Sequence, residues 1–439
     1  MSDIILVTHW TGGDVFPFMR FGKLLKNEGH KVTILTHCVY EKKAREMGLD
    51  FVAVDTNEEY ENINRDMINL SDPIGKKEDY LKFHILYHGK ERLLREVKLI
   101  ESICTSESII IARHRSSISG LLAAERKHLP YASMILAPNY FSHMELHDQI
   151  FGKELCEEIN KARADLNLKP ISNWKKWLYS PQYILCGWPK WYANADETWP
   201  ECAYPIGFIE SYDVSNHFVV DKEISEFISR AKDKNQKIAI VTGGSSRMVS
   251  KDFYNTAIQA CIIAGLNAIV VTPYKEYIPE DIPDTIKWAC NVPLKEIMKE
   301  ADIVIHHGGM GTINEAIDVA IPQIVMPHLT DGPDNADRLV GLGIATKFPP
   351  KMWNATLIAD GIKEQLDDEA KSLCIRYKDM NIESYSARLG QKVISQIAPY
   401  VLPEQEQNTM EIKEENISRK QLSKKMLLEL IKKRQEKNE

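Results

Sequence analysis

The sequence has 439 residues, which suits two domains of ordinary size better than one. Hydrophobic residues make up 44% and charged residues 27%, a globular composition that excludes a disordered or fibrous chain. The formal net charge of −7 argues against a protein that holds nucleic acid by neutralising its phosphates.

The eight cysteines are scattered, with no C-x-x-C pair and no zinc-type spacing, so we expect free thiols. The first apolar run has no basic segment before it and ends at Thr8-His9, so it predicts a strand rather than a signal peptide. No run approaches the roughly 18 apolar residues that a membrane span needs. These features predict a soluble, cytoplasmic protein.

The first half alternates β-rich runs with helical patterns. Strands are predicted at 4–8, 31–36, 51–55, 108–112 and 131–137, and helices at 16–28, 86–103 and 118–127. This alternation implies right-handed βαβ units and a parallel sheet with both faces covered. The stretch from Pro138 to Pro200 breaks the rhythm and is rich in tryptophan and tyrosine.

The alternation then restarts. Strands are predicted at 237–242, 268–272, 302–306 and 323–326, and helices at 253–264 and 294–300. We therefore expect one domain at 1–212, a second at 221–400, and a linker near 211–220. At 405–439 we expect an appended amphipathic helix that docks on the chain's own surface or on a partner protein, because five apolar residues share one helical face: Leu422, Met426, Leu427, Leu430 and Ile431.

The strongest motif is Ile-His-His-Gly-Gly-Met-Gly-Thr-Ile-Asn-Glu at 305–315, directly after a predicted strand. A strand, a Gly-rich turn and a helix start surround one point with backbone N–H groups and the positive helix end, which suits a diphosphate. His307 and Thr312 could add hydrogen bonds there. The alternative is a tight turn with a buried histidine.

Two further turns follow strands. Val-Thr-Gly-Gly-Ser-Ser at 241–246 would face the same phosphate group, although alone it could be an ordinary loop. In the segment 326–336, Asp331 could accept hydrogen bonds from sugar hydroxyls. Alternatively, Asp331 or Asp334 caps the next helix, and for Asp334 we favour capping.

A fourth turn, Thr-Gly-Gly-Asp-Val-Phe-Pro at 11–17, follows the first strand. It lacks the third glycine of G-x-G-x-x-G, so a dinucleotide site fits poorly. Because this turn lies at the carboxyl end of the first strand, we expect the side chain of Asp14 to point into a cleft at that end of the sheet. The alternative is that Asp14 caps a helix beginning at Phe16.

Together these segments resemble the family 1 glycosyltransferases of the GT-B fold, in particular the branch that acts on bacterial natural products, sterols and lipids. The signature of that family, H-G-G-x-G-T-x-x-E-A followed by G-[VI]-P-x-x-x-x-P and D-[QG]-x-x-N-A, is matched at His307–Ala316, Ile321-Pro322, Pro327 and Asp331–Ala336. The resemblance implies an α/β protein with two Rossmann-like domains facing across a cleft, over most of residues 1–400.

The resemblance also implies roles for individual residues. Ser245 would bind phosphate beside His307, Glu315 would take the ribose hydroxyls, and Asp331 would bind the sugar. The loop 291–294 would cradle the nucleobase. The full set assigned to the donor is Gly244, Ser245, Ser246, Asn291, Val292, His307, Gly308, Gly309, Gly311, Thr312, Glu315, Asp331 and Gly332.

For catalysis the resemblance points to Asp14 as the base, where many relatives have a histidine. Arg113 and His114 stand where an acidic partner of that histidine is expected, which is coherent because a carboxylate base needs no such partner. Asn291 replaces a base-stacking tryptophan and Gly332 replaces a glutamine, so UDP-glucose in particular is not indicated. Contacts to the acceptor are expected from His9, Trp10, His114, Tyr140, Trp174 and Trp177.

These assignments predict inverting transfer of a hexose from a UDP- or dTDP-sugar to a hydroxyl of a lipophilic acceptor such as a polyketide, macrolide or sterol-like lipid. The helix end and hydrogen-bond donors would stabilise the leaving diphosphate, so we expect neither a metal nor another cofactor. Two alternatives stay open: a nucleotide-sugar 2-epimerase and a non-catalytic partner that binds nucleotide sugars. For the tryptophans, core packing is the alternative role.

Overall fold

A computed structural model describes residues 2–70, 75–181, 183–209, 220–245, 247, 249–290, 292–328, 331–384, 393–395 and 397. The chain divides into two compact units, Met1–Leu402 and Pro403–Glu439, and all described residues belong to the first. The helix expected at 405–439 and nearly all of the expected linker lie outside the described residues.

The first sheet has seven parallel strands in the order β3-β2-β1-β4-β5-β6-β7. In the central register, Leu6 pairs with Ile34 on one side and with Ile111 on the other. The strand order reverses between β1 and β4, and doubly wound sheets bind ligands at such points. The strands are β1 Asp3–Val7, β2 Lys31–Thr36, β3 Asp50–Ala53, β4 Ser108–Arg113, β5 Tyr131–Ile135, β6 Ile184–Cys186 and β7 Ala203–Pro205.

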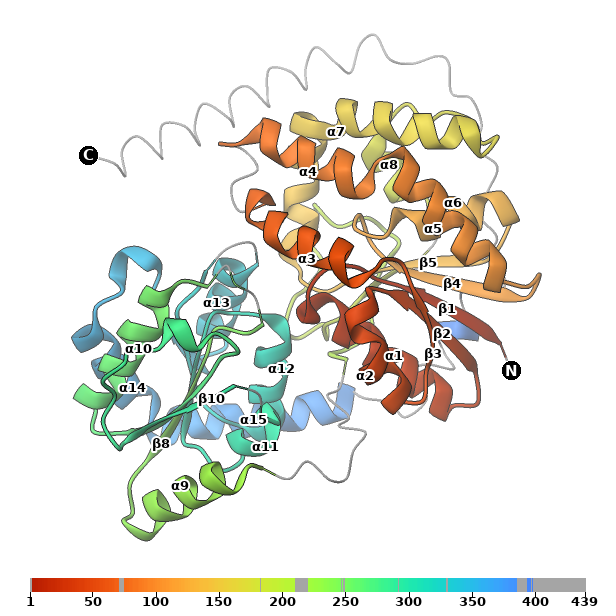
Figure 1. Cartoon of the computed structure of the whole chain (residues 1–439). Helices are drawn as coiled ribbons and strands as arrows, with labels where there is room; N and C mark the ends of the chain where they lie inside the picture. Colours follow the sequence, from red (N-terminus) through yellow and green to blue (C-terminus); the bar gives the residue numbers. More distant parts are fainter. Residues whose placement is uncertain are drawn as a thin grey trace. The chain divides into compact units, whose positions relative to one another are not determined.

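Helices cover both faces of this sheet (Figure 1). Ile4 and Leu6 of β1 join the core beneath α1, whereas Ile5 and Val7 join the core beneath α5 and α6. Because alternate residues face opposite layers and both layers are buried, the central strands are apolar over most of their length. The helices are α1 Gly12–Asn27, α2 Glu41–Glu46, α3 Asn57–Asp66, α4 Lys77–His88, α5 Lys90–Ile103, α6 Ile118–Lys127, α7 Asn139–Asp165 and α8 Trp174–Leu178.

The second sheet has six parallel strands in the order β10-β9-β8-β11-β12-β13, with the reversal between β8 and β11. Its strands are β8 Ile238–Thr242, β9 Asn267–Val271, β10 Ile286–Ala289, β11 Ile303–His306, β12 Gln323–Val325 and β13 Ala345–Lys347. The helices of this half are α9 Lys222–Asp233, α10 Lys251–Ile263, α11 Leu294–Met298, α12 Met310–Val319, α13 Gly332–Gly341, α14 Ala355–Gln365 and α15 Asp368–Ser384. The two α/β sheets confirm the predicted fold class.

Two predicted helices differ most from the observed bounds. The helix predicted at 86–103 is divided into α4 and α5 at Gly89, which has an extended backbone; a Cβ there would lie 2.0 Å from the carbonyl oxygen of Ile85. The helix predicted from Phe16 begins at Gly12, because Thr11 takes the N-cap position.

The stretch from Pro138 to Pro200 was expected to break the alternation, and this prediction is wrong. It contains α7, α8 and β6, and the parallel series continues through β7. Strands β6 and β7 have only three residues each, too short for a periodic pattern to reveal them. The edge strands β10 and β13, with four and three residues, were also too short to be predicted.

The last described residues return to the first core. Val393, Ile394 and Ile397 are buried with Ile4 and Phe18, in the layer beneath α1. All eight cysteines are free, as predicted. Within the described part of the chain, no helix combines the length and the apolar character that crossing a membrane would require.

Candidate functional site

The two Gly-rich turns of the second half meet at one point, because β8 and β11 are neighbours. The ring of His307 lies between them: a Cβ on Gly244 would stand 2.7 Å from its Cε1 atom, and one on Gly309 would stand 2.5 Å from its Nε2 atom. The structure therefore brings Gly244, His307 and Gly309 together at the reversal point of the sheet.

His306, directly before His307, is buried and shapes the turn. Its Nδ1 accepts a hydrogen bond from the backbone N–H of Gly308 at 3.1 Å, and its Nε2 lies 3.0 Å from Oε1 of Gln323. Burial lowers the pKa of His306 to about 3, so the neutral ring carries its hydrogen on Nε2. Burial, aided by His328, also lowers the pKa of His307 to about 4, which leaves a neutral ring able to donate one hydrogen bond.

Gly308 and Gly332 are in backbone-to-backbone contact. Gly308 has φ +94°, and a Cβ there would lie 2.9 Å from both Cα and the carbonyl oxygen of Gly332. A Cβ on Gly332 would in turn lie 2.7 Å from the carbonyl oxygen of His307. Both positions accept only glycine without movement of the backbone.

We expect Gly308→Ala to destabilise the protein and abolish nucleotide binding. The positive φ costs about 1–2 kcal/mol, and forcing the Gly332 backbone away adds about 1–3 kcal/mol. Gly265→Ala is the matched control, since Gly265 has φ +74° and nothing within 4 Å of its Cβ position. Urea unfolding and UDP titration of both variants give the comparison; equal losses of stability would show that the contact with Gly332 is unimportant.

Asn335 joins these elements and was missed as a functional residue. Its Nδ2 donates to the carbonyl oxygen of Gly308 at 2.9 Å and to Oδ2 of Asp331 at 3.0 Å. Its Oδ1 accepts from the hydroxyl of Tyr192 at 3.2 Å, and the residue is fully buried. Asn335 thus ties the turn proposed for the diphosphate to the carboxylate proposed for the sugar.

Asp331 occupies the N-cap position of α13, which begins at Gly332. The predicted capping role of Asp334 is therefore wrong: its carboxylate lies in the first turn and pairs with Arg338 one turn on, at 2.7 Å. The N-cap was misplaced because α13 starts with Gly-Pro, and a proline is favoured inside the first turn of a helix.

The start of α12 carries Thr312 in its first turn and Glu315 one turn further. A Cβ on Gly311 would meet nothing within 4 Å, so the backbone is accessible there. Burial raises the pKa of Glu315, although the charge of Arg20 opposes that shift. Nη2 of Arg20, on α1, lies 3.0 Å from Oε1 of Glu315. Arg20 was not predicted, because no local pattern links two residues so far apart in sequence.

The remaining donor residues lie around this point of the second half. The carbonyl oxygen of Ser245 accepts a hydrogen bond from Tyr274 at 2.9 Å. Val292 is partly buried and packs beside α11. Ser246 and Asn291 lie outside the described residues.

Asp14 occupies the third position of α1 and forms a capping box with Thr11, so the alternative that Asp14 is itself the N-cap is wrong. Its Oδ2 accepts from the backbone N–H and the hydroxyl of Thr11, each at 3.2 Å. Its Oδ1 lies 2.7 Å from Nη2 of Arg113, the last residue of the neighbouring strand β4. The side chain keeps 21% of its surface exposed, so it remains accessible to a substrate.

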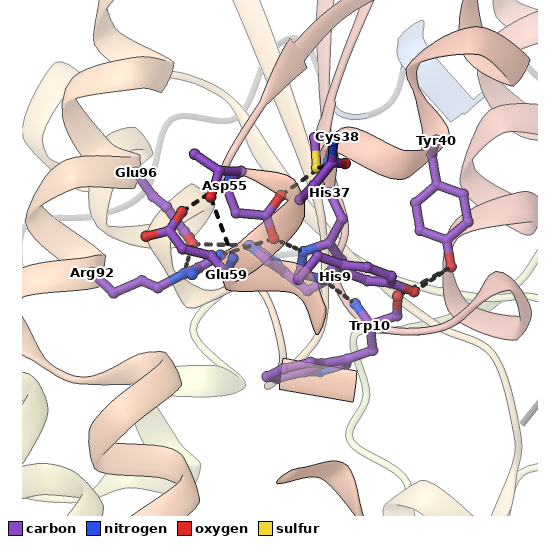
Figure 2. A network of polar contacts seen from close by, with 12 residues as sticks. His9, Trp10, His37, Cys38, Tyr40, Asp55, Glu59, Arg92 and Glu96 are labelled. Carbon is purple, nitrogen blue, oxygen red and sulfur yellow. Dashed lines mark hydrogen bonds and ion pairs between the residues drawn. The ribbon is translucent and has the colours of Figure 1, made fainter. Parts of the chain in front are cut away.

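A buried polar network includes His9 and Trp10, which lie in the loop between β1 and α1 (Figure 2). His37 lies 2.6 Å from Asp55 and accepts from the backbone N–H of Trp10 at 2.8 Å. Glu96 lies 3.1 Å from His9 and 2.9 Å from Arg92. Burial alone would raise the pKa of Glu96, but His9 and Arg92 outweigh it and hold that pKa well below its usual range.

The residues expected to bind the acceptor fall into three pairs. Trp174 and Trp177 are each 2% exposed and belong to the first core, and the indole of Trp177 donates to Glu125 at 2.8 Å. His9 and Trp10 belong to the buried polar network. His114 is buried, and its carbonyl oxygen accepts from the hydroxyl of Tyr140 at 3.2 Å.

Two family models match separate parts of the chain. The glycosyltransferase family 28 N-terminal domain matches residues 4–86, and the erythromycin biosynthesis protein CIII-like C-terminal domain matches residues 262–395. Sterol 3-beta-glucosyltransferases are similar over 82% of the chain, at 24% identity in Saccharomyces cerevisiae and 23% in Komagataella phaffii. The chain spans about a third of their length, 32% and 31% respectively.

Solved structures share the fold. The glycosyltransferase of kitacinnamycin is 16% identical, with a TM-score of 0.69 over 90% of this chain and 99% of its own. The calicheamicin glycosyltransferase CalG4 is 14% identical, with a TM-score of 0.69 over 92% of this chain and 100% of its own. The glycosyltransferase VinC, solved with dTDP, has the same TM-score and 16% identity over 90% of this chain and 99% of its own.

Proposed function

We propose that this chain, which belongs to the family 1 glycosyltransferases of the GT-B fold, transfers a hexose from a nucleoside diphosphate sugar to a hydroxyl of a lipophilic small molecule. The observation that carries the proposal is the meeting of the two Gly-rich turns with His307 between them, at the start of α12. Backbone N–H groups at a helix start, beside a neutral histidine, suit a diphosphate.

In the proposed reaction, Asp14 accepts the proton of the acceptor hydroxyl as its oxygen attacks the anomeric carbon. The bond to the diphosphate breaks in the same displacement, which inverts the configuration. Charge then grows on the leaving diphosphate, and His307, Thr312, Ser245 and the start of α12 stabilise it. In this scheme the protein supplies the positive potential, so a metal ion is not needed.

The residues that would contact the ribose, the sugar and the nucleobase of the donor are assigned from their positions in the sequence motifs. Glu315 binds the ribose hydroxyls, and its pairing with Arg20 places a cation from α1 beside that carboxylate. Asp331, held by Asn335, binds the sugar. The loop that includes Val292 takes the nucleobase.

The names of the relatives support a lipophilic acceptor without choosing one. The similar sequences include sterol 3-beta-glucosyltransferases, and the similar structures include glycosyltransferases named for kitacinnamycin and calicheamicin. We therefore propose a sterol-like, polyketide or macrolide acceptor. UDP- and dTDP-sugars are the donors to test, and dTDP is the nucleotide present in the VinC structure.

Product analysis tests the proposal directly. The protein is incubated with a panel of UDP- and dTDP-sugars, with and without lipophilic alcohols, and the products are identified by mass spectrometry and NMR. Transfer to the alcohol is the expected outcome. Formation of an epimeric nucleotide sugar would identify an epimerase instead, and binding without any product would identify a non-catalytic partner.

We expect His307→Ala to weaken nucleoside diphosphate binding by about 1.5–3 kcal/mol, the range for a hydrogen bond to a charged group. Calorimetry with UDP and dTDP measures this loss. His30→Ala replaces a histidine at the start of β2 and should leave the affinity unchanged. Unchanged affinity in a folded His307→Ala protein would remove His307 from the diphosphate site.

A further inference from the structure

A pocket of about 210 Å³ opens in the first half of the chain, between α4 and α7. Its walls are largely apolar, and a cavity of roughly 150 Å³ holds benzene, so this one has space for a ring or a short chain. His88 in its lining packs against Trp10, with ring centroids 4.7 Å apart. Trp10 lies in the loop between β1 and α1, four residues before Asp14, so the pocket adjoins the segment that leads to the proposed catalytic base. The apolar lining residues are Leu81, Ile85, Ile118, Leu155, Ile159 and Trp174.

Arg115 brings a permanent positive charge to this pocket. Its backbone has φ +62°, an uncommon conformation for a long side chain. Its guanidinium lies over the ring of Tyr140, 4.5 Å from the centroid, and the groups that act on its charge are the phenols of Tyr140, Tyr80 and Tyr179. Among the residues that the structure describes, Arg115 forms no ion pair with a carboxylate. A guanidinium in apolar surroundings favours an anionic partner.

The carboxylates around the pocket do not supply that partner, because each already pairs with a lysine. Lysine charges therefore balance the acidic residues, and the charge of Arg115 remains uncompensated. The pairs are Glu154 with Lys77 at 2.7 Å, Glu157 with Lys153 at 3.9 Å, and Glu158 with Lys161.

Two histidines in the lining have unused ring nitrogens. Nε2 of His88 and Nδ1 of His147 are buried without a hydrogen-bond partner, in residues that are 8% and 9% exposed. His147 lies 2.5 Å from the hydroxyl of Tyr80 through its other nitrogen, Nε2. If that hydroxyl donates, the hydrogen of the neutral ring is on Nδ1, where it can donate to a ligand. Burial holds the pKa of both histidines well below their usual range, so neither ring adds a positive charge to that of Arg115.

We propose that the acceptor carries a single carboxylate, bound in this pocket by Arg115 with help from His147, while its apolar part lies against the pocket walls. The inference rests on the proposed transferase function for the identity of the occupant. One guanidinium balances one negative charge and matches the two oxygens of a carboxylate. The apolar walls and small volume suit a ring or chain beside that group.

Binding without any donor tests the charge preference. Octanoate and octanamide share a chain and differ in charge, and calorimetry compares them on the full-length protein. We expect octanoate to bind at least 10-fold more tightly, the lower range for a charged hydrogen bond. Arg115→Gln should abolish the preference, whereas Arg115→Lys should keep part of it. Lys161→Gln is the matched control, because Lys161 also lines the pocket but is already paired with Glu158.

Equal binding of octanoate and octanamide to the unaltered protein, or a preference that survives in folded Arg115→Gln protein, would overturn the inference. Transfer assays with 8-hydroxyoctanoate and its amide then address the occupant. Preferred transfer to the acid supports the inference, and preferred transfer to the amide contradicts it. A binding preference without transfer to any acceptor would refute the proposed function while leaving the carboxylate site in place, so the two failures are distinguishable.

Discussion

Replacing Asp14 by Asn should lower turnover about 100- to 10,000-fold and leave nucleotide affinity unchanged, the range for loss of a general base. An asparagine keeps the size and much of the hydrogen bonding of the aspartate, so the capping box with Thr11 should largely persist. It removes the negative charge that holds Arg113 at 2.7 Å and would accept the acceptor's proton. Steady-state kinetics together with UDP calorimetry separate the two effects.

A matched control for this experiment is Glu59, in the first half of the chain. Glu59 occupies the same position of a capping box, at the start of α3, and pairs with Arg95 at 2.7 Å. Glu59→Gln therefore removes the same kind of charge from the same kind of helix start. We expect its turnover to match that of the unaltered protein. If Asp14→Asn turned over at a near-normal rate, Asp14 would have only its structural role.

Acidification should destabilise this protein steeply below about pH 6.5, because several histidines are buried in neutral form. Burial, with the charge of Arg115, lowers the pKa of His114 to about 3, and burial does the same for His306. Both are at most 2% exposed. In the unfolded chain a histidine has a pKa of about 6.5, so the unfolded state binds these protons first as the pH falls.

The direction and size of this loss of stability follow from the difference between the unfolded and folded pKa values of each histidine. Each such histidine lowers the free energy of unfolding by about 1.4 kcal/mol per pH unit between its unfolded and folded pKa values. His114 and His306 together should cost about 5 kcal/mol between pH 6 and pH 4, comparable to the whole stability of a marginal domain. The low pKa of Glu96 acts in the same direction, since its stabilising charge is lost as the pH falls further.

Urea unfolding at a series of pH values measures the slope. His114→Gln should reduce it by about 1.4 kcal/mol per pH unit, the value for one proton. His128→Asn, at an exposed left-handed helix end where asparagine is tolerated, controls for the loss of a histidine. A slope that is unchanged in His114→Gln would mean that this ring is not kept neutral by burial.

The sequence by itself determined the elements with long, regular patterns. Strand β2 and helix α6 have the predicted bounds, and the other central strands deviate by a residue or two. Central strands are buried on both faces, so their apolar runs are continuous and easily recognised. The Gly-rich turns were equally visible, because close backbone approach and positive φ leave glycine as the residue that fits, as at Gly308.

Only the tertiary structure decided which residues meet. The pairs Asp14 with Arg113, Glu315 with Arg20, and Gly308 with Asn335 join residues distant in sequence, and no local periodicity connects such partners. The same holds for the pocket around Arg115, whose walls come from four helices. The short edge strands β7 and β13 also needed the structure, since three residues gain their stability from the neighbouring strand and not from their own pattern. Local patterns determine which backbone forms, whereas packing between elements determines which side chains share a site.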